Sequence, residues 1–237
     1  MESFIAKSPQ SLKVLNVMRV SASLPVNILI EGEKGTGKET LVNSVFKNIA
    51  KYSVEELIDQ KPESKEIFIR DFEKVPDVMS FMNRLKEYRI IAATTAYKEI
   101  YEDFFPVRIY IPPLKEREED LEELKRLYIQ KVKKEFELDD MPQTFDLDLS
   151  TNAISLKRSI YERALFEKLD DERFMRLSEE FLKNRLEEGY KSLLRFFEIP
   201  LLRAAKKRYK SALGMSKALG LNRATLTAKL KKYDAML

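Results

Sequence analysis

A short glycine-rich segment near the start of the chain has the residue types that bind phosphate. Residues 32–38 read Gly-Glu-Lys-Gly-Thr-Gly-Lys, which fits the first seven positions of the P-loop pattern. Glycines let backbone N–H groups approach phosphate oxygens, and the lysine that ends the loop can reach the outer phosphates. We therefore expect this segment to bind ATP or ADP. The residues predicted to contact the nucleotide are Gly32, Gly35, Thr36, Gly37, Lys38, Glu39 and Thr40.

A loop of this kind needs a strand before it and a helix after it, and the flanking residues predict both. Residues 26–31 read as a buried strand, and residues 39–50 read as a helix. Other strand patterns cover 66–70, 89–94 and 107–111, and other helical patterns cover 11–22 and 78–88. Alternating strands and helices predict a parallel sheet covered by helices. The sequence thus predicts an α/β P-loop domain over residues 1–112.

Two further regions follow the pair of prolines at 112–113. Residues 113–172 are helical in pattern and strongly charged, with a turn-rich break, and they predict a helical subdomain. An amphipathic pattern then predicts one long helix over 177–197. Pro200 predicts the start of the next helix, because proline is tolerated in a first helical turn. We place a third, all-α domain at residues 173–237.

The end of the chain combines a basic composition with a helix-turn-helix pattern. From Leu201 onward, ten lysines and arginines accompany a single acid, Asp234. Helical patterns over 210–219 and 223–233 flank a tight Gly-Leu-Asn turn, whose Asn222 can cap the second helix. This layout is typical of DNA-binding modules, although an ordinary basic helical hairpin has the same pattern. The second-helix side chains free to meet double-stranded DNA are Arg223, Thr225, Thr227, Ala228, Lys229 and Lys232.

The composition of the 237-residue chain excludes several kinds of chemistry. The chain has no Cys for disulfides or thiolate metal sites, and no His, which is the usual general base and a common metal ligand. It shows no catalytic carboxylate pair or nucleophile triad, so we predict no catalytic residue and no metal site. No apolar run is long enough to cross a membrane. We expect a cytoplasmic protein that has no membrane partner.

The C-terminal residues resemble the Fis-type DNA-binding domain that ends many NtrC-like bacterial regulators. The resemblance lies in Glu-Ile-Pro-Leu-Leu-Arg-Ala-Ala at 198–205 and in Leu-Gly-Leu-Asn-Arg-Ala-Thr-Leu-Thr-Ala-Lys-Leu-Lys-Lys-Tyr at 219–233. It implies a homodimer formed by the helices that precede the helix-turn-helix. It places these residues at the positions that meet DNA: Asn222, Arg223, Thr225 and Lys229. Thr227 and Ala228 depart from the family, where basic residues are common.

The first part of the chain resembles the AAA+ domain of the same NtrC-like regulators. The matching segments are 4–9, the P-loop at 32–39, the Walker B stretch at 67–76, the sensor strand at 90–95 and the lid entry at 111–121. The resemblance implies a parallel AAA+ sheet with a helical lid, and it extends over nearly the whole chain. Because it begins almost at Met1, we expect no receiver or sensory domain.

Several positions depart from that family in ways that affect ATP hydrolysis. Arg70 and Asp71 replace the Walker B Asp-Glu pair, and an arginine offers no acceptor to Mg²⁺. Thr95 replaces the sensor asparagine, the lid's sensor arginine is replaced near Ser155, and the arginine-finger segment before Pro106 is missing. The loop with the GAFTGA motif, which contacts sigma-54, is missing before the Walker B stretch. We therefore expect Mg²⁺ to be poorly held and ATP hydrolysis to be weak.

The sequence leaves three functional interpretations open. The leading one is a sequence-specific DNA-binding transcriptional regulator, independent of sigma-54, whose degenerate AAA+ domain binds nucleotide or scaffolds oligomerisation. The second is an enzyme, an active ATPase that remodels sigma-54 promoter complexes. The third is a regulatory protein that joins the ring of a full-length relative. Double-stranded DNA and a second copy of the chain are the expected partners, with RNA polymerase or a related AAA+ regulator as further candidates.

Overall fold

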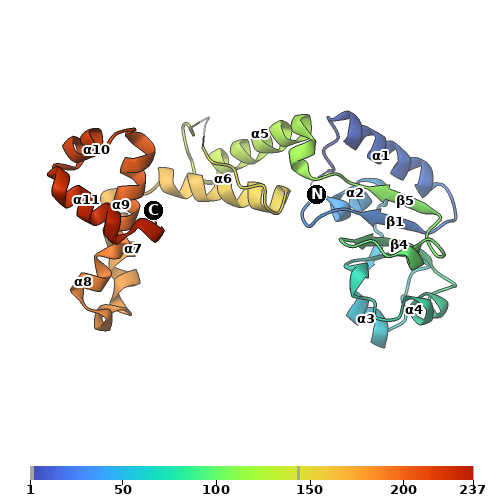
Figure 1. Cartoon of the computed structure of the whole chain (residues 1–237). Coiled ribbons are helices and arrows are strands. Elements are labelled where there is room, and N and C mark those ends of the chain that lie inside the picture. Colours follow the sequence, from blue (N-terminus) through green and yellow to red (C-terminus); the bar gives the residue numbers. More distant parts are fainter. Residues whose placement is uncertain (1–2, 143–144, 237) are drawn as a thin grey trace. The chain divides into compact units, whose positions relative to one another are not determined.

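A computed structural model describes residues 3–142 and 145–236 of the chain (Figure 1). The internal contacts divide the chain into two compact units, Met1–Lys168 and Leu169–Leu237. The first unit contains the sheet and the charged helical region, and the second contains the basic helices. In the described residues, no helix is both long enough and apolar enough to span a lipid bilayer.

The first unit is built on a parallel five-stranded sheet with the strand order β2-β3-β4-β1-β5. The strands are β1 (Ile28–Glu31), β2 (Ala50–Tyr52), β3 (Glu66–Ile69), β4 (Arg89–Thr94) and β5 (Val107–Tyr110). Four of them lie where the apolar patterns predict strands, which confirms the parallel-sheet prediction. The sequence does not predict β2, because its three residues are only partly buried or exposed and give no apolar signal.

Helices cover both faces of this sheet (Figure 1). One apolar cluster joins α1 (Pro9–Ala22) and α2 (Lys38–Val45) to one face, and a second joins α3 (Val54–Asp59) and α4 (Val78–Arg84) to the other. Successive residues of β1 alternate between the two clusters, with Leu29 on the side of α3 and α4. Because both faces are buried, the central strands are apolar except at their end residues.

Three helices of this unit differ in length from their predicted spans. α2 ends at Val45 instead of residue 50, because Asn48 has a left-handed backbone conformation (φ 62°) and Ala50 begins β2. α4 ends at Arg84 instead of residue 88, where the chain turns toward β4. α1 begins two residues earlier than predicted, since the Ser8 side chain caps it and Pro9 is tolerated in its first turn.

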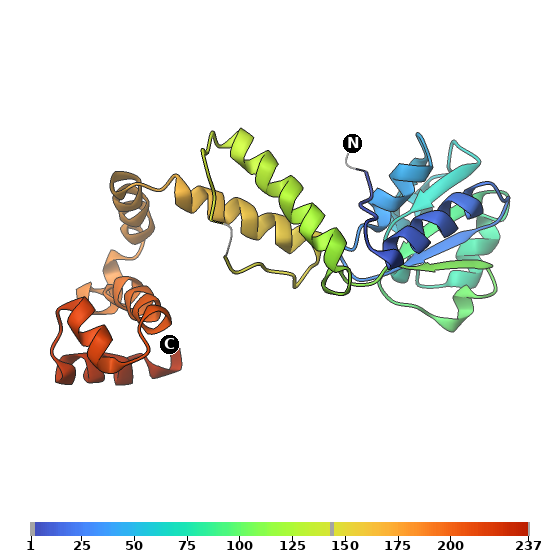
Figure 2. The same cartoon turned by 90° about the horizontal axis from the view of Figure 1, so that it is seen from above.

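Two long helices complete the first unit. α5 (Glu118–Glu135) and α6 (Ala153–Glu167) lie side by side (Figure 2). Their shared core consists of apolar side chains from both helices and from the segments that flank them, among them Leu114, Tyr128, Val132, Met141, Leu156, Ile160 and Ala164. Both helices fall in the region whose pattern predicts a helical subdomain, and they position one wall of the site described below.

The second unit is entirely helical in its described residues. Its α-helices are α7 (Asp171–Lys183), α8 (Tyr190–Leu193), α9 (Arg195–Arg208), α10 (Ala212–Leu219) and α11 (Arg223–Lys232). α9, α10 and α11 share a small core made by Leu202, Ala205, Met215, Leu226 and Tyr233. The two helices predicted around the Gly-Leu-Asn turn are therefore confirmed, and Leu226 faces the other helices as its spacing predicts.

The prediction of a single helix over residues 177–197 is wrong. The chain instead forms the end of α7, a short 3₁₀ turn at Leu186–Glu188, α8, and the first residues of α9. Gly189 interrupts the helical path with a φ of 78°, a conformation that glycine adopts without a steric penalty. Pro200 is also wrong as a helix start, because it lies inside α9, where it removes one backbone hydrogen-bond donor.

Candidate functional site

The predicted phosphate loop connects the end of β1 to the first turn of α2. Gly35 and Gly37 have φ values of 81° and 100°, which favour glycine over any other residue. A Cβ atom on Gly32 would lie 2.8 Å from the carbonyl oxygen of Ile111, so this position also requires glycine. The structure therefore brings the predicted loop residues together at a helix N-terminus, as an anion-binding loop requires.

The Lys38 side chain folds over the loop. Its Nζ donates hydrogen bonds to the carbonyl oxygens of Gly32 (2.6 Å) and Glu33 (2.8 Å). Burial lowers the pKa of the Lys38 ammonium below its ordinary value, and the carboxylates of Glu73, Asp71 and Glu33 oppose this shift. The cation is thus placed at the mouth of the loop, where it can exchange carbonyl oxygens for phosphate oxygens.

A cleft of about 1200 Å³ opens beside this loop. One wall is the loop and the start of α2, and a second is the carboxyl ends of β3 and β4 with the residues that follow them. The third wall is the start of α6. Ligands of parallel α/β proteins bind at the carboxyl ends of the strands, so the cleft lies where a ligand is expected.

The residues at the Walker B position line this cleft but do not form an acidic pair. Arg70 and Asp71 are both exposed, and Asp71 forms an ion pair with Lys74 (3.1 Å). A carboxylate that the sequence analysis overlooked, Glu73, lies nearby. It accepts hydrogen bonds from the hydroxyl (2.6 Å) and the backbone N–H (3.1 Å) of Thr95, the residue at the sensor position.

The environment of Glu73 keeps it ionised. Burial raises its pKa, but the hydrogen bonds from Thr95 outweigh this effect, and the pKa is below its ordinary value. Glu73 is therefore a fixed negative charge that acts on the Lys38 ammonium. Its position two residues after Asp71 was the available signal, since any acid that follows a buried strand at this edge can face the loop.

Helix α6 contributes a cation that the sequence analysis also overlooked. Lys157 lines the cleft one turn after Ala153 and Ile154. Arg158, the nearby arginine, instead forms an ion pair with Asp148 (2.9 Å) outside the cleft lining. Ser155 is buried and accepts a hydrogen bond from the Thr151 N–H (2.9 Å). The lid side of the cleft thus carries a lysine and no arginine.

A smaller and more apolar cavity, of about 410 Å³, adjoins the loop on another side. Phe4 and Ile5 of the N-terminal segment, Leu124 and Tyr128 of α5, and Gly37 of the loop are among its lining residues. Ligand pockets are mainly apolar with a few polar groups, so this cavity can take a flat ring while the loop takes an anion.

The second unit presents the predicted DNA-binding residues on α11. The Asn222 side chain caps this helix by accepting a hydrogen bond from the Thr225 N–H (2.8 Å), as predicted. Arg223 is exposed, and Thr225 is half-buried. Lys229 differs, because its ammonium donates to the Glu198 carboxylate on α9. Glu198 also lies 3.8 Å from the Lys232 ammonium.

Comparison with known proteins supports the fold. Residues 4–60 match the model of the sigma-54 interaction domain. The structure is similar to NtrX from Brucella abortus in complex with ATP (TM-score 0.53, 15% identity, 98% of this chain and 69% of that chain). It is also similar to the ADP complex of NtrX (TM-score 0.55, 14% identity, 97% and 69%). No curated protein sequence gives a significant match. The chain therefore shares the AAA+ P-loop fold, and its first residues match a sigma-54 activator-type domain.

Proposed function

We propose that this protein is a DNA-binding transcriptional regulator whose AAA+ domain binds ATP or ADP and hydrolyses ATP poorly. The observation that carries the proposal is that one cleft combines an intact phosphate loop with an altered metal-binding position. The phosphate loop keeps each glycine and the lysine in place, while Arg70 stands at the position of the metal-binding carboxylate. Such a cleft favours binding over phosphoryl transfer.

Nucleotide binding is supported by two adjacent cavities of suitable chemistry. Gly35, Gly37 and Lys38 supply backbone donors and a cation for phosphates. Phe4 and Tyr128 line the apolar cavity, which suits an adenine ring. NtrX has been crystallised with ATP and with ADP, which supports the same ligands for this chain.

Weak hydrolysis follows from the groups near the loop. Arg70 has no acceptor for Mg²⁺, and Asp71 is paired with Lys74. Two further carboxylates act on Lys38, but both oxygens of Glu73 accept hydrogen bonds from Thr95, and Glu33 accepts one from the Asn152 side chain (3.1 Å). In phosphoryl transfer Mg²⁺ neutralises the developing charge, and these residues fit that ion poorly. The intact phosphate loop and the ionised Glu73 favour the alternative of an active ATPase.

DNA binding is supported by the helices of the second unit. α10 and α11 are joined by a short turn in which Gly220 has a φ of 62°, the layout of a helix-turn-helix. Arg223, Lys231 and Lys232 are exposed on α11, so cationic groups are available to phosphates and base edges. We assign base contact to Arg223 and phosphate contact to Lys232.

A homodimer is supported by an apolar surface on α7. Phe174, Leu177 and Phe181 are spaced three and four residues apart on one face of this helix, and all are exposed. No residue of α7 is buried, although the helix is amphipathic. Exposed apolar stripes of this kind mark interfaces. A second copy of the chain is the occupant we propose, in agreement with the two-fold sites that paired helix-turn-helix units read.

Three sets of measurements on the 237-residue chain test the proposal and its alternatives. ADP binding by calorimetry combined with a steady-state phosphate-release assay separates a binding protein from an ATPase. Turnover of several per minute that Lys38→Ala abolishes would establish the enzyme instead. An electrophoretic mobility shift with duplex DNA at low salt tests DNA binding by the second unit. The absence of a shift would refute the proposal that the protein is a DNA-binding regulator. Mass measurements of mixtures with a related AAA+ regulator test the alternative of a ring partner.

Glu73→Gln is predicted to tighten ADP binding in the absence of Mg²⁺ by about threefold to tenfold, because it removes a negative charge that competes with phosphate for Lys38. Titration of ADP in the presence of a chelator measures the effect. Glu39→Gln is the matched control, since Glu39 lines the same cleft but is paired with Lys51 (2.8 Å). Weaker binding by Glu73→Gln in Mg²⁺ would instead identify Glu73 as a metal ligand.

Glu198→Gln is predicted to strengthen nonspecific DNA binding severalfold and to lower the stability of the protein by about 1–2 kcal/mol. The carboxylate neutralises Lys229 and accepts a hydrogen bond from the Tyr233 hydroxyl (2.6 Å). Salt titrations of DNA affinity and thermal unfolding measure the two effects. Unchanged affinity at every salt concentration would show that Lys229 makes no phosphate contact.

The Glu198 carboxylate makes the stability of the folded protein depend on pH. Hydrogen bonds from Lys229 and Tyr233 lower the pKa of Glu198 below its ordinary value of 4.5. Its contribution to stability is therefore fully present above pH 4.5, and it is lost as the pH falls through the lowered pKa of the folded protein. Thermal unfolding of wild type and Glu198→Gln should converge at acidic pH.

A further inference from the structure

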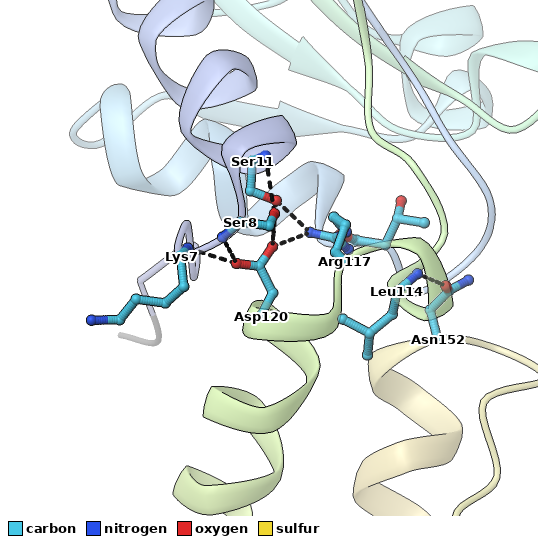
Figure 3. A network of polar contacts seen from close by, with 8 residues as sticks. Lys7, Ser8, Ser11, Leu114, Arg117, Asp120 and Asn152 are labelled. Atoms are coloured by element: carbon cyan, nitrogen blue, oxygen red, sulfur yellow. Dashed lines mark hydrogen bonds and ion pairs between the residues drawn. The ribbon is translucent and has the colours of Figure 1, made fainter.

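A buried polar network connects the start of α1, the start of α5 and the phosphate loop (Figure 3). Asp120, in the first turn of α5, is fully buried. Its Oδ1 accepts hydrogen bonds from the backbone N–H groups of Lys7 (2.6 Å) and Ser8 (2.9 Å), and its Oδ2 accepts from the hydroxyls of Ser8 and Ser11. Four donors from the N-terminal segment thus converge on one carboxylate.

Arg117 extends this network to the phosphate loop. Its side chain is only 3% exposed. One terminal nitrogen donates to the Ser11 hydroxyl (3.2 Å) and lies 3.3 Å from Asp120 Oδ2, while the other donates to the carbonyl oxygen of Thr36 (3.0 Å). The planar guanidinium presents donors in fixed directions, so one side chain can hold the loop and the carboxylate at the same time.

The contact to Thr36 fixes a peptide group that a phosphate would meet. In a trans peptide the C=O and the following N–H point in opposite directions. Holding the Thr36 carbonyl therefore also sets the direction of the Gly37 N–H, at the N-cap residue of α2. Gly37 lines both the large cleft and the apolar cavity, whereas Arg117 lines only the apolar cavity. The guanidinium therefore contacts the loop from outside the lining of the large cleft.

We propose that Arg117 is a positioning residue that holds the phosphate loop in its anion-binding conformation, with Asp120 and Ser11 fixing its guanidinium. This inference rests on the proposed binding of nucleotide. Arg117 does not itself touch the phosphates in this assignment. It orients the Thr36–Gly37 peptide, and it links the loop to Ser11 of α1 and to Asp120 of α5.

Arg117→Lys tests the assignment, because lysine keeps the positive charge but has one terminal nitrogen in place of the two that donate in fixed directions from a guanidinium. We expect ADP to bind about tenfold more weakly, because the Thr36–Gly37 peptide is no longer held in the orientation that faces the phosphates. Arg89→Lys is the matched control. Arg89 also donates to main-chain carbonyls, those of Ser21 (2.9 Å) and Ala22 (3.1 Å), but it does not line either cavity.

Hydrogen exchange of the peptide covering residues 32–41 provides a readout that does not need a nucleotide. Faster exchange there in Arg117→Lys, but not in Arg89→Lys, is the expected result. Ser11→Ala, which removes one support of the guanidinium, should change exchange and ADP affinity in the same direction by a smaller factor. It serves as the test if Arg117→Lys does not fold.

The outcomes separate the two proposals. Wild-type protein that binds no nucleotide would refute the proposed nucleotide function, and the exchange data would still decide the role of Arg117. Folded Arg117→Lys that exchanges like wild type in residues 32–41 would overturn the inference. So would ADP affinity within twofold of a wild type that does bind ADP.

Discussion

Lys38→Ala is expected to weaken ADP binding by about 30-fold or more, because a charge-assisted hydrogen bond to phosphate contributes about 2–3 kcal/mol. The Lys38 ammonium is held at the loop by the carbonyl oxygens of Gly32 and Glu33, so it is already in place for an anion. Alanine removes the cation and leaves those two carbonyl oxygens facing the phosphate. Isothermal titration with ADP, with and without Mg²⁺, measures the loss.

Lys34→Ala is the control for this substitution. Lys34 belongs to the same loop and lines the same cleft. Its backbone carbonyl oxygen accepts a hydrogen bond from the Asn152 side chain (3.0 Å), and this contact does not involve the Lys34 ammonium. We expect Lys34→Ala to weaken ADP binding by no more than about threefold, as for a solvated charge. Equal losses from both variants would mean that the loop attracts the anion only by its total charge. Unchanged binding by Lys38→Ala would refute the assignment of the loop.

Arg223→Ala is expected to weaken binding to the specific DNA site by about tenfold to 100-fold, while binding to random DNA falls much less. Arg223 is exposed at the first turn of α11, next to the Asn222 cap, where the recognition helix of a helix-turn-helix contacts base edges. Competition mobility shifts with a selected site and with random duplex measure the two affinities separately.

Lys232→Ala is the matched control on the same helix. Its ammonium is exposed near the end of α11, where it can contact a phosphate. Loss of that contact should weaken binding to specific and random DNA alike, and should reduce the slope of log affinity against log salt concentration by about one. Equal effects of the two variants on both kinds of DNA would leave DNA binding intact but remove base reading from Arg223. A protein that shifts no DNA at low salt would contradict both assignments.

The features that the sequence by itself determined are local ones. The phosphate loop is encoded within one strand, one turn and one helix, so its glycines and Lys38 could be identified from spacing alone. The strands β1, β3 and β4 were predictable because each contains a continuous apolar run that is buried on both faces. The edge strand β5 was predictable because its apolar residues Val107 and Ile109 alternate with exposed residues. The cap of α11 likewise depends on Asn222 and Thr225, which are three residues apart.

The local signals failed at three places in the helices and the sheet. The apolar pattern over 177–197 continues through Gly189, but the left-handed backbone of that glycine divides the helix. Pro200 reads as a helix start, yet it lies inside α9, which packs through Leu202 and Ala205 on α10 and α11. β2 has too few buried residues to give a pattern of its own.

Only the tertiary structure decided which side chains meet across the sites. The sequence analysis considered Asp71 at the Walker B position and overlooked Glu73, whose carboxylate is held by Thr95 and acts on Lys38. Helical spacing left Lys229 free for DNA, but its ammonium meets Glu198, which is 31 residues away in the chain. Arg117 reaches Thr36 across 81 residues. Periodicity predicts the face on which a residue lies, whereas the partner on that face depends on how distant segments pack.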